Sequence, residues 1–330
     1  MNTKIVLSVA PSVFLLCGLL LVGGCSTPES SESLPGDATS SSTFSVSCTS
    51  NIVKDLVAQV GGDHISVTAI MDGPGVDPHL YTPSPQDINV LTQSDVVVYS
   101  GLHLEAQLEE ALESLETRSI PVIKVTEILE RDHADALLEA DGAVDPHVWF
   151  DLVLWGKCAG WLADELAKID PDNADSYRAN AEAFQVQLAE TQSKAEQLLK
   201  DVDEERRILV TAHDAFQYFA RTFKFRVEAV QGLSTESEPG LKRINELATL
   251  LVDSKIHSIF TEQSVSDRNI QALLAECKSR GHQITIGGTL YSDTAGPAGT
   301  PEETLAGAVM HDVRNVARGL RVATGSQETP

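Results

Sequence analysis

The sequence predicts an α/β protein with two (βα)4 lobes, each built on a parallel sheet, joined by one long rigid helix. The first observation is the stretch 171–202, which runs on after Pro171 without a Gly or a second Pro. The second is the alternation of strand and helix patterns on both sides of this stretch, which is typical of parallel βαβ units. One large domain with a long surface helix is the alternative at this point.

The stretch 171–203 is predicted to be the linking helix, because its apolar residues recur in steps of four and three. These residues are Tyr177, Ala181, Phe184, Leu188, Thr191, Ala195, Leu198 and Val202. Asp170 or Asp172 can cap the start, and Pro171 suits the first turn. About thirty residues at about 1.5 Å each would extend about 45 Å, enough to cross a whole domain. The opposite face is polar, so we expect a strut that lies across two lobes.

Residues 43–170 are expected to form the N-terminal lobe. Apolar runs predict four strands at 43–48, 64–71, 95–99 and 120–125. Helical patterns lie at 52–60, 86–91, 104–115 and 149–169, the first with Asn51 as its cap. Residues 72–85 contain many Gly and Pro residues, which predicts a stiff loop. Residues 127–146 are acidic and are predicted to be a loop.

Residues 204–323 show the same alternation of strand and helix patterns and are expected to form the C-terminal lobe. Strands are predicted at 208–211, 226–230, 256–260 and 284–286. Helices are predicted at 215–223 with Asp214 as cap, at 241–254, at 268–279 with Asp267 as cap, and at 301–322. The tail 324–330 is expected to be disordered.

The N-terminus predicts a targeting segment. Lys4 precedes an almost wholly apolar run, 5–22, that ends in Gly23, Gly24 and Cys25. Small residues before a Cys at the end of such a run resemble a bacterial lipoprotein signal. We therefore expect residues 1–24 to be a signal peptide, Cys25 to be lipidated, and residues 25–42 to be a flexible tether. A plain secretory signal or an uncleaved membrane anchor is the alternative.

The charge and the cysteine content of the chain argue against some partners and some kinds of stabilisation. The chain has 24 Lys and Arg against 48 Asp and Glu, a formal net charge of −24, which argues against a nucleic-acid partner. Beyond the leader and Cys25, the cysteines are Cys48, Cys158 and Cys277. An odd number implies no disulfide framework, although one pair could form. Cys158 and Cys277 lie on apolar helix faces, where packing is expected.

Four side chains are candidate metal ligands because they follow predicted strands or stiff loops, and parallel α/β sheets bind ligands at the carboxyl ends of their strands. His79 and His147 each end an Asp-Pro-His triplet, His213 directly follows a strand, and Asp293 lies beyond the last strand. Three imidazoles and a carboxylate suit a divalent transition metal and do not suit calcium. Ordinary loop histidines bonded to backbone are the alternative.

Five motifs, in order, resemble the metal-binding solute-receptor family of ABC importers, the TroA-like group for zinc and manganese. They are Gly-Val-Asp-Pro-His-Leu-Tyr-Thr-Pro-Ser-Pro-Gln-Asp at 75–87, Asp-Pro-His-Val-Trp-Phe-Asp at 145–151, Thr-Ala-His-Asp-Ala-Phe-Gln-Tyr-Phe at 211–219, Phe-Thr-Glu-Gln-Ser-Val-Ser at 260–266 and Leu-Tyr-Ser-Asp at 290–293. The resemblance covers residues 43 to about 322. It implies two (βα)4 lobes joined by one helix, with His79, His147, His213 and Asp293 binding a metal in the cleft between them.

The resemblance also places Glu262 near the site, where we expect it to orient a ligand imidazole. A dication with three neutral imidazoles and one carboxylate keeps one positive charge, which Glu262 would cancel. Binding is expected to weaken as the imidazoles protonate near their reference pKa of about 6.5. His103 is expected to be structural, and His133 to belong to a solvated acidic loop.

The predicted function is that of an extracytoplasmic receptor in the cell envelope, a monomer with no enzymatic activity. It would capture one ion and pass it to an ABC permease and its ATPase. A nitrogen-rich site should hold zinc more tightly than manganese. The absence of a His-rich loop favours manganese slightly as cargo. A surface adhesin is one alternative, and a zinc hydrolase is another, although no His-Glu-x-x-His helix is present.

Overall fold

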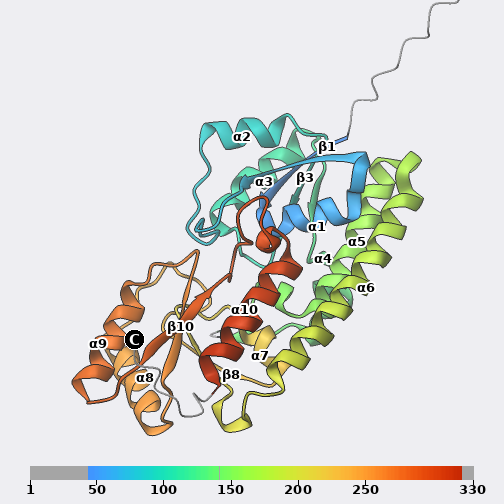
Figure 1. Ribbon diagram of the computed structural model, residues 1–330. Helices are drawn as coiled ribbons and strands as arrows, with labels where there is room; N and C mark the ends of the chain where they lie inside the picture. The colour runs from blue at the N-terminus through green and yellow to red at the C-terminus, as the bar shows by residue number, and fades with distance from the viewer. Residues whose placement is uncertain (1–43, 141, 322–330) are drawn as a thin grey trace, which may run out of the picture. The chain divides into compact units, whose positions relative to one another are not determined.

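The computed structural model describes residues 44–140 and 142–321 (Figure 1), which all fall in one compact unit. The predicted signal peptide, Cys25, the tether and the tail lie outside the described residues. Within the two described ranges, no helix combines the length and the apolar character needed to cross a membrane.

The N-terminal lobe contains a four-stranded parallel sheet in the order β2-β1-β3-β4. Its strands are β1 (Phe44–Ser50), β2 (Ile65–Met71), β3 (Val96–Tyr99) and β4 (Val122–Lys124). Its helices are α1 (Asn51–Gly61), α2 (Pro85–Thr92), α3 (Glu109–Thr117), α4 (Glu127–Asp132) and α5 (Leu152–Ile169). Alternate strand residues face opposite sides: Val96 and Val98 pack into the core with α1 and α5, whereas Val97 packs with α2 and α3.

Two local predictions in this lobe are wrong. Residues 127–146 form α4, a 3-10 turn and the small antiparallel pair β5 (Glu139–Ala140) and β6 (Ala143–Val144), not a plain loop. Leu129 is buried beneath the acidic surface, and the hydroxyl of Tyr218 accepts a hydrogen bond from the backbone N–H of Leu138. Ser50 caps α1 in place of Asn51, which sits inside the helix and bonds elsewhere.

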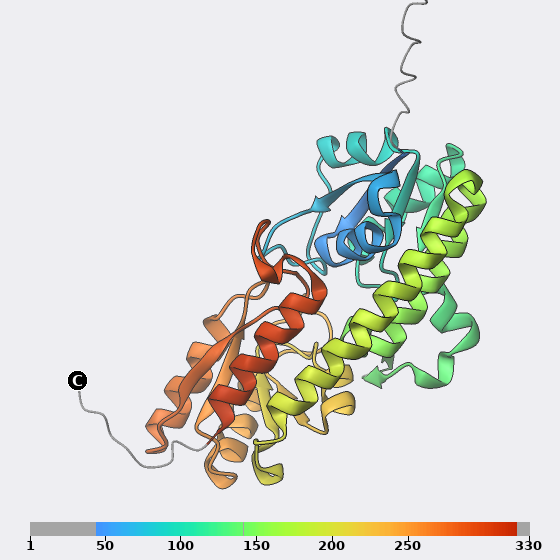
Figure 2. The ribbon, with the colours of Figure 1, turned by 45° about the vertical axis from the view of Figure 1, so that its right-hand side comes forward.

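The linking helix α6 (Ala174–Leu199) follows a 3-10 turn at Pro171–Asn173. Its buried residues are Tyr177, Ala181, Phe184, Leu188, Thr191, Ala195 and Leu199, so the predicted face is correct up to the last turn, where Leu199 takes the place of Leu198. The helix packs along α5 and also contacts α1 in one lobe and α10 in the other. Figure 2 shows it in yellow-green beside both lobes.

The C-terminal lobe has four strands in two parallel pairs. The strands are β7 (Ile208–Thr211), β8 (Arg226–Ala229), β9 (Ser258–Glu262) and β10 (Thr285–Leu290). The pairs are β7 with β8 and β9 with β10, and β7 lies beside β9. The helices are α7 (Gln217–Phe223), α8 (Leu241–Asp253), α9 (Arg268–Ser279) and α10 (Leu305–Leu320). Asp214 does not cap α7, because its carboxylate accepts from the side chain of Gln217.

One hydrophobic core runs through both lobes. The cluster that contains Val46 and Trp155 continues through α6 to Phe216, Phe260 and Val316 of the C-terminal lobe. The rings of Phe150 and Phe216 meet across the junction at 4.7 Å between centroids. Separating the lobes would expose this apolar surface, at a cost of about 25 cal/mol for each Å². Cys48, Cys158 and Cys277 are buried and free.

Candidate metal centre

The four predicted ligands come together at one point, two from each lobe. One candidate ligand atom from each of His79, His147, His213 and Asp293 lies within 4.8 Å of all the others. Nε2 of His147 is 3.4 Å from Nε2 of His79 and 3.3 Å from Nε2 of His213. Oδ1 of Asp293 is 3.3 Å from both His147 Nε2 and His213 Nε2. Ligands about 2.0–2.1 Å from a tetrahedral ion would be about 3.3–3.4 Å apart, so the spacing fits one ion.

The backbone brings these side chains together in different ways. His213 comes two residues after β7 and Asp293 three residues after β10, at the carboxyl ends of parallel strands. His79 lies in the Gly- and Pro-rich loop between β2 and α2. His147 follows the β5-β6 pair and not a strand of the main sheet, so the location at a strand end does not apply to this residue, whereas its place in the Asp-Pro-His triplet does.

The two Asp-Pro-His triplets form the same local structure. Oδ1 of Asp77 accepts a hydrogen bond from the backbone N–H of His79, and Oδ1 of Asp145 accepts one from the backbone N–H of His147, both at 2.9 Å. Pro between them fixes φ and has no N–H of its own to satisfy. The triplets were identified from the sequence, but the hydrogen bond that each Asp accepts from the backbone of the next His was not predicted.

Two buried carboxylates orient two of the imidazoles. Asp145 Oδ1 lies 2.7 Å from His147 Nδ1, and Glu262 Oε2 lies 2.5 Å from His213 Nδ1. Glu262 Oε1 also accepts from the backbone N–H groups of Ala212 at 2.7 Å and His213 at 2.9 Å. A carboxylate at Nδ1 keeps the proton there and leaves the Nε2 lone pair free for a metal. Sequence reasoning missed Asp145 as an orienting group, although its place two residues before His147 was a usable signal.

Asp293 supplies the negative charge that faces the three nitrogens. Its Oδ2 accepts a hydrogen bond from Ser264 Oγ at 3.0 Å. Its Oδ1 is buried, and the Nε2 atoms of His147 and His213 each lie 3.3 Å from it. A buried carboxylate oxygen that faces ring nitrogens suits a cation bound between them.

Burial and neighbouring charges shift the pKa values of these groups. Burial disfavours the charge on Asp293, but His213 and His147 outweigh it and hold the pKa of Asp293 well below its usual range. Burial also disfavours the imidazolium of His147, but Asp145 and Asp293 raise its pKa to about 9. Asp293 and Glu262 likewise raise the pKa of His213 against burial. Burial lowers the pKa of His79 to about 3, so this imidazole is neutral.

Among the described residues, no second group of three or more His, Cys, Asp or Glu lies close enough to hold an ion. His103 is exposed and pairs with Glu109 at 2.6 Å, and His133 is also outside the group. The candidate site therefore contains the three predicted histidines and neither His103 nor His133.

We expect Glu262→Gln to reduce metal affinity by about 10- to 100-fold, the usual effect of losing an outer carboxylate. The amide oxygen would stay with the two backbone N–H groups, which places the NH2 group against His213 Nδ1. That NH2 would donate to Nδ1 and move the ring proton to Nε2, where it blocks the metal. Titration with Zn²⁺ against a competing chelator measures the change.

Glu105→Gln is the matched control. Glu105 is also a buried glutamate that accepts from backbone N–H groups, those of Ser100 and Gly101, and none of its hydrogen bonds in the described part of the chain involves an imidazole. Its variant should bind metal as the wild type does. Equal losses in the two variants would mean that Glu262 acts through general stability alone.

A closed set of three imidazoles and a carboxylate between two α/β lobes spanned by one helix defines a metal-binding receptor. The chain belongs to the family described as zinc-uptake complex component A, periplasmic, whose model matches residues 46–319. It is 37% identical over 300 residues to the manganese-binding lipoprotein MntA of Bacillus subtilis, covering 90% of this chain and 94% of that protein. It is 36% identical over 272 residues to the zinc-binding protein TroA of Treponema pallidum, covering 82% and 87%.

The solved structures agree with this assignment. The periplasmic zinc-binding protein TroA from Treponema pallidum matches with a TM-score of 0.81 and 35% sequence identity, over 85% of this chain and all of that one. The fold class predicted from the sequence, two α/β lobes with parallel strands and one long connecting helix, is confirmed.

Proposed function

We propose that this protein is the extracytoplasmic solute-binding component of an ABC importer. It captures a divalent transition metal, Mn²⁺ or Zn²⁺, between its two lobes and delivers it to a membrane permease driven by its ATPase. The proposed ligands are His79, His147, His213 and Asp293. The observation that carries the proposal is the convergence of three Nε2 atoms on an Asp293 oxygen that has no other partner in the part of the chain that the structure describes.

The site favours capture over catalysis. A zinc hydrolase keeps one coordination position open for water and places a general base beside it. Four protein ligands would fill a tetrahedral shell, and all four side chains are buried. The nearby carboxylates of Asp145 and Glu262 are engaged with ligand imidazoles, which leaves neither free to activate water. The protein is therefore a receptor and not an enzyme.

Both manganese and zinc are expected to bind. The relatives include proteins named for manganese and for zinc at nearly equal identity. The nitrogen-rich site should favour zinc in affinity. We retain manganese as the favoured cargo, as the missing His-rich loop suggests. Metal analysis of the native protein, followed by competition of manganese against zinc, tests this assignment.

We propose that a lipid at the N-terminus anchors the receptor. Residues 1–24 act as a signal peptide, Cys25 carries the lipid, and residues 25–42 tether the folded body to the membrane. The body consists of an N-terminal lobe (43–170), the linking helix (171–203) and a C-terminal lobe (204–323), with a tail at 324–330, and acts as a monomer. Relatives named as lipoproteins support the lipid anchor.

A deletion strain tests the receptor role against adhesion. We expect metal uptake to fall when the gene is deleted, to return with the wild-type protein, and not to return with His79→Ala. An adhesin without a transport role would leave uptake unchanged on deletion and alter only attachment.

A further inference from the structure

The three imidazoles of the metal centre are not held equally. Nδ1 of His147 and Nδ1 of His213 each meet a buried carboxylate. Nδ1 of His79 receives no hydrogen bond from the residues that the structure describes, and His79 is the most exposed of the four candidate ligands, at 4% against 0–1%. His79 therefore depends on its backbone for its position.

Asp293, by contrast, lies in a loop that is fixed to both lobes. The indole N–H of Trp149 donates to the carbonyl of Ser292 at 3.0 Å. The side chain of Asn51 on α1 accepts from the N–H of Ala295 at 2.9 Å and donates to its carbonyl at 3.2 Å. These bonds and the shared hydrophobic core fasten the C-terminal lobe to the N-terminal lobe on the side of Asp293.

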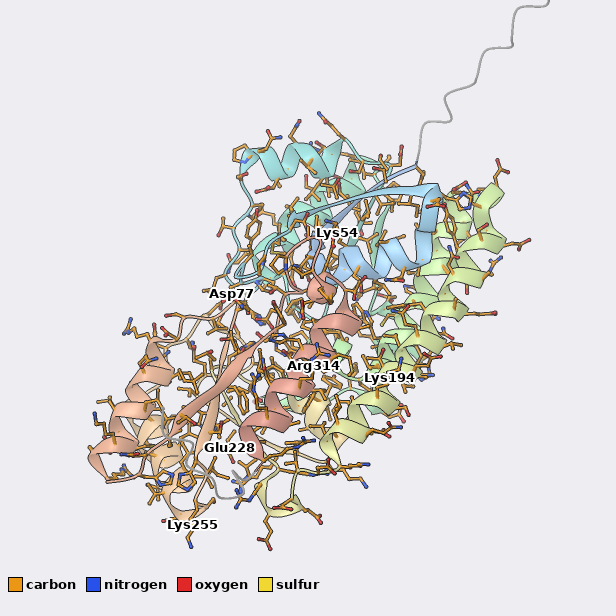
Figure 3. All side chains as sticks on the ribbon, viewed as in Figure 1. Lys54, Asp77, Lys194, Glu228, Lys255 and Arg314 are labelled. Atoms are coloured by element: carbon orange, nitrogen blue, oxygen red, sulfur yellow. The ribbon has the colours of Figure 1, made fainter. Side chains whose placement is uncertain are left out.

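The loop that carries His79 has one hydrogen bond to the C-terminal lobe in the described part of the chain. Oδ2 of Asp77 accepts from the hydroxyl of Thr235 at 2.6 Å, while Oδ1 of the same carboxylate holds the backbone N–H of His79. Figure 3 labels Asp77 where the two lobes meet. The Asp77 carboxylate therefore joins a ligand backbone in one lobe to a hydroxyl in the other.

Thr235 is in turn tied to the region of His213. The side chain of Gln231 donates to the carbonyls of Thr235 at 3.3 Å and Ser237 at 3.2 Å. The backbone N–H of Gln231 donates to the carbonyl of Ala212 at 2.9 Å, next to His213. Thr235 is buried and Asp77 is half-buried, so the bond between them is partly shielded from water and is stronger than an exposed one. Gln107 of the N-terminal lobe also donates an exposed hydrogen bond to Glu236, next to Thr235, but Gln107 does not belong to the loop that carries His79.

We propose that Thr235 is a positioning residue that acts through Asp77 to hold His79 on the ion, and that His79 is the first ligand to leave when the metal is released. The other three ligands stay in place because carboxylates or loop anchors fix them. Release then needs the Thr235–Asp77 hydrogen bond to break and the 72–84 loop to move, with no large rotation of the lobes. This inference rests on the proposed metal capture.

Thr235→Val tests the proposal because it removes the hydroxyl and keeps the branched shape. We expect the rate at which Zn²⁺ dissociates into excess chelator to rise about tenfold, as loss of one hydrogen bond to a charged group would produce. Association should change little. Thr235→Ser restores the hydroxyl and should return the rate to within about twofold of the wild type.

Thr126→Val is the matched control. Thr126 is a buried threonine whose hydroxyl donates to the carbonyl of Ser100 at 2.8 Å within the N-terminal lobe. Thermal unfolding of the metal-free proteins checks that both variants fold. An unchanged dissociation rate in Thr235→Val, an equal change in Thr126→Val, or no rescue by Thr235→Ser would overturn the proposal while metal capture stands. A wild-type protein that binds neither Zn²⁺ nor Mn²⁺ would overturn the proposed function itself.

Discussion

Replacement of Asp293 by Asn is expected to lower the affinity for Mn²⁺ or Zn²⁺ by more than about 100-fold, beyond the range for an outer-shell residue. Among the described residues, Asp293 supplies the carboxylate oxygen of the candidate site, and its Oδ1 lies 3.3 Å from Nε2 of His147 and from Nε2 of His213. An amide removes the negative charge and places either a neutral oxygen or an NH2 group at that position. Isothermal titration calorimetry with each metal, and competition with a chelator for the wild type, would measure the loss.

Asp55→Asn is the control for removing a buried carboxylate. Asp55 accepts from the backbone N–H of Leu305 at 2.9 Å across the lobe junction and from Gln59 at 3.1 Å. Burial raises the pKa of Asp55, and an amide oxygen can keep the bond to Leu305, so metal affinity should not change. If Asp293→Asn bound metal as tightly as the wild type, Asp293 would not be a ligand, and the observation that carries the proposed function would be lost.

The long helix shows how far the sequence predicts this fold. Its buried face from Tyr177 to Ala195 could be predicted, because a helix that touches two lobes must keep one continuous apolar stripe. The β5-β6 pair could not be predicted, since strands of two residues show no hydrophobic periodicity. Nor did the sequence indicate that the C-terminal strands would be hydrogen-bonded in two separate pairs, because register and pairing depend on contacts far apart in the chain.

In the metal centre, too, some residues could be predicted from the sequence and others could not. The four proposed ligands and Glu262 were named from their positions in motifs, and the structure brings all five together. Thr235 was not identified, because a single Thr in a polar loop carries no local signal and its partner, Asp77, is 158 residues away. Asn51 was assigned to a helix cap for the same reason, since its contact with Ala295 spans 244 residues. Residues that support a site from another lobe are visible only once the chain has folded.

Metal binding is expected to release protons and to strengthen steeply with pH. In the metal-free protein, Asp145 and Asp293 raise the pKa of His147 to about 9, and Asp293 and Glu262 raise that of His213. Below about pH 9 the ring of His147 is protonated, and the raised pKa of His213 favours its protonated form, so a metal must displace protons before it can bind Nε2. Between about pH 6 and pH 8, the apparent affinity should therefore rise roughly ten- to a hundredfold per pH unit, for one or two protons released. The pKa of His79 is lowered to about 3, so this ring is neutral throughout and adds nothing.

This expectation differs from the one based on the reference pKa of about 6.5, which would make the affinity level off near neutral pH. Calorimetric titration in buffers of different ionisation enthalpy counts the protons released at each pH. Asp293→Asn removes one cause of both raised pKa values, so its residual binding should depend less on pH than that of the wild type. An affinity that is constant above about pH 7, with no proton release, would show that the carboxylates around the site orient the imidazoles without charging them.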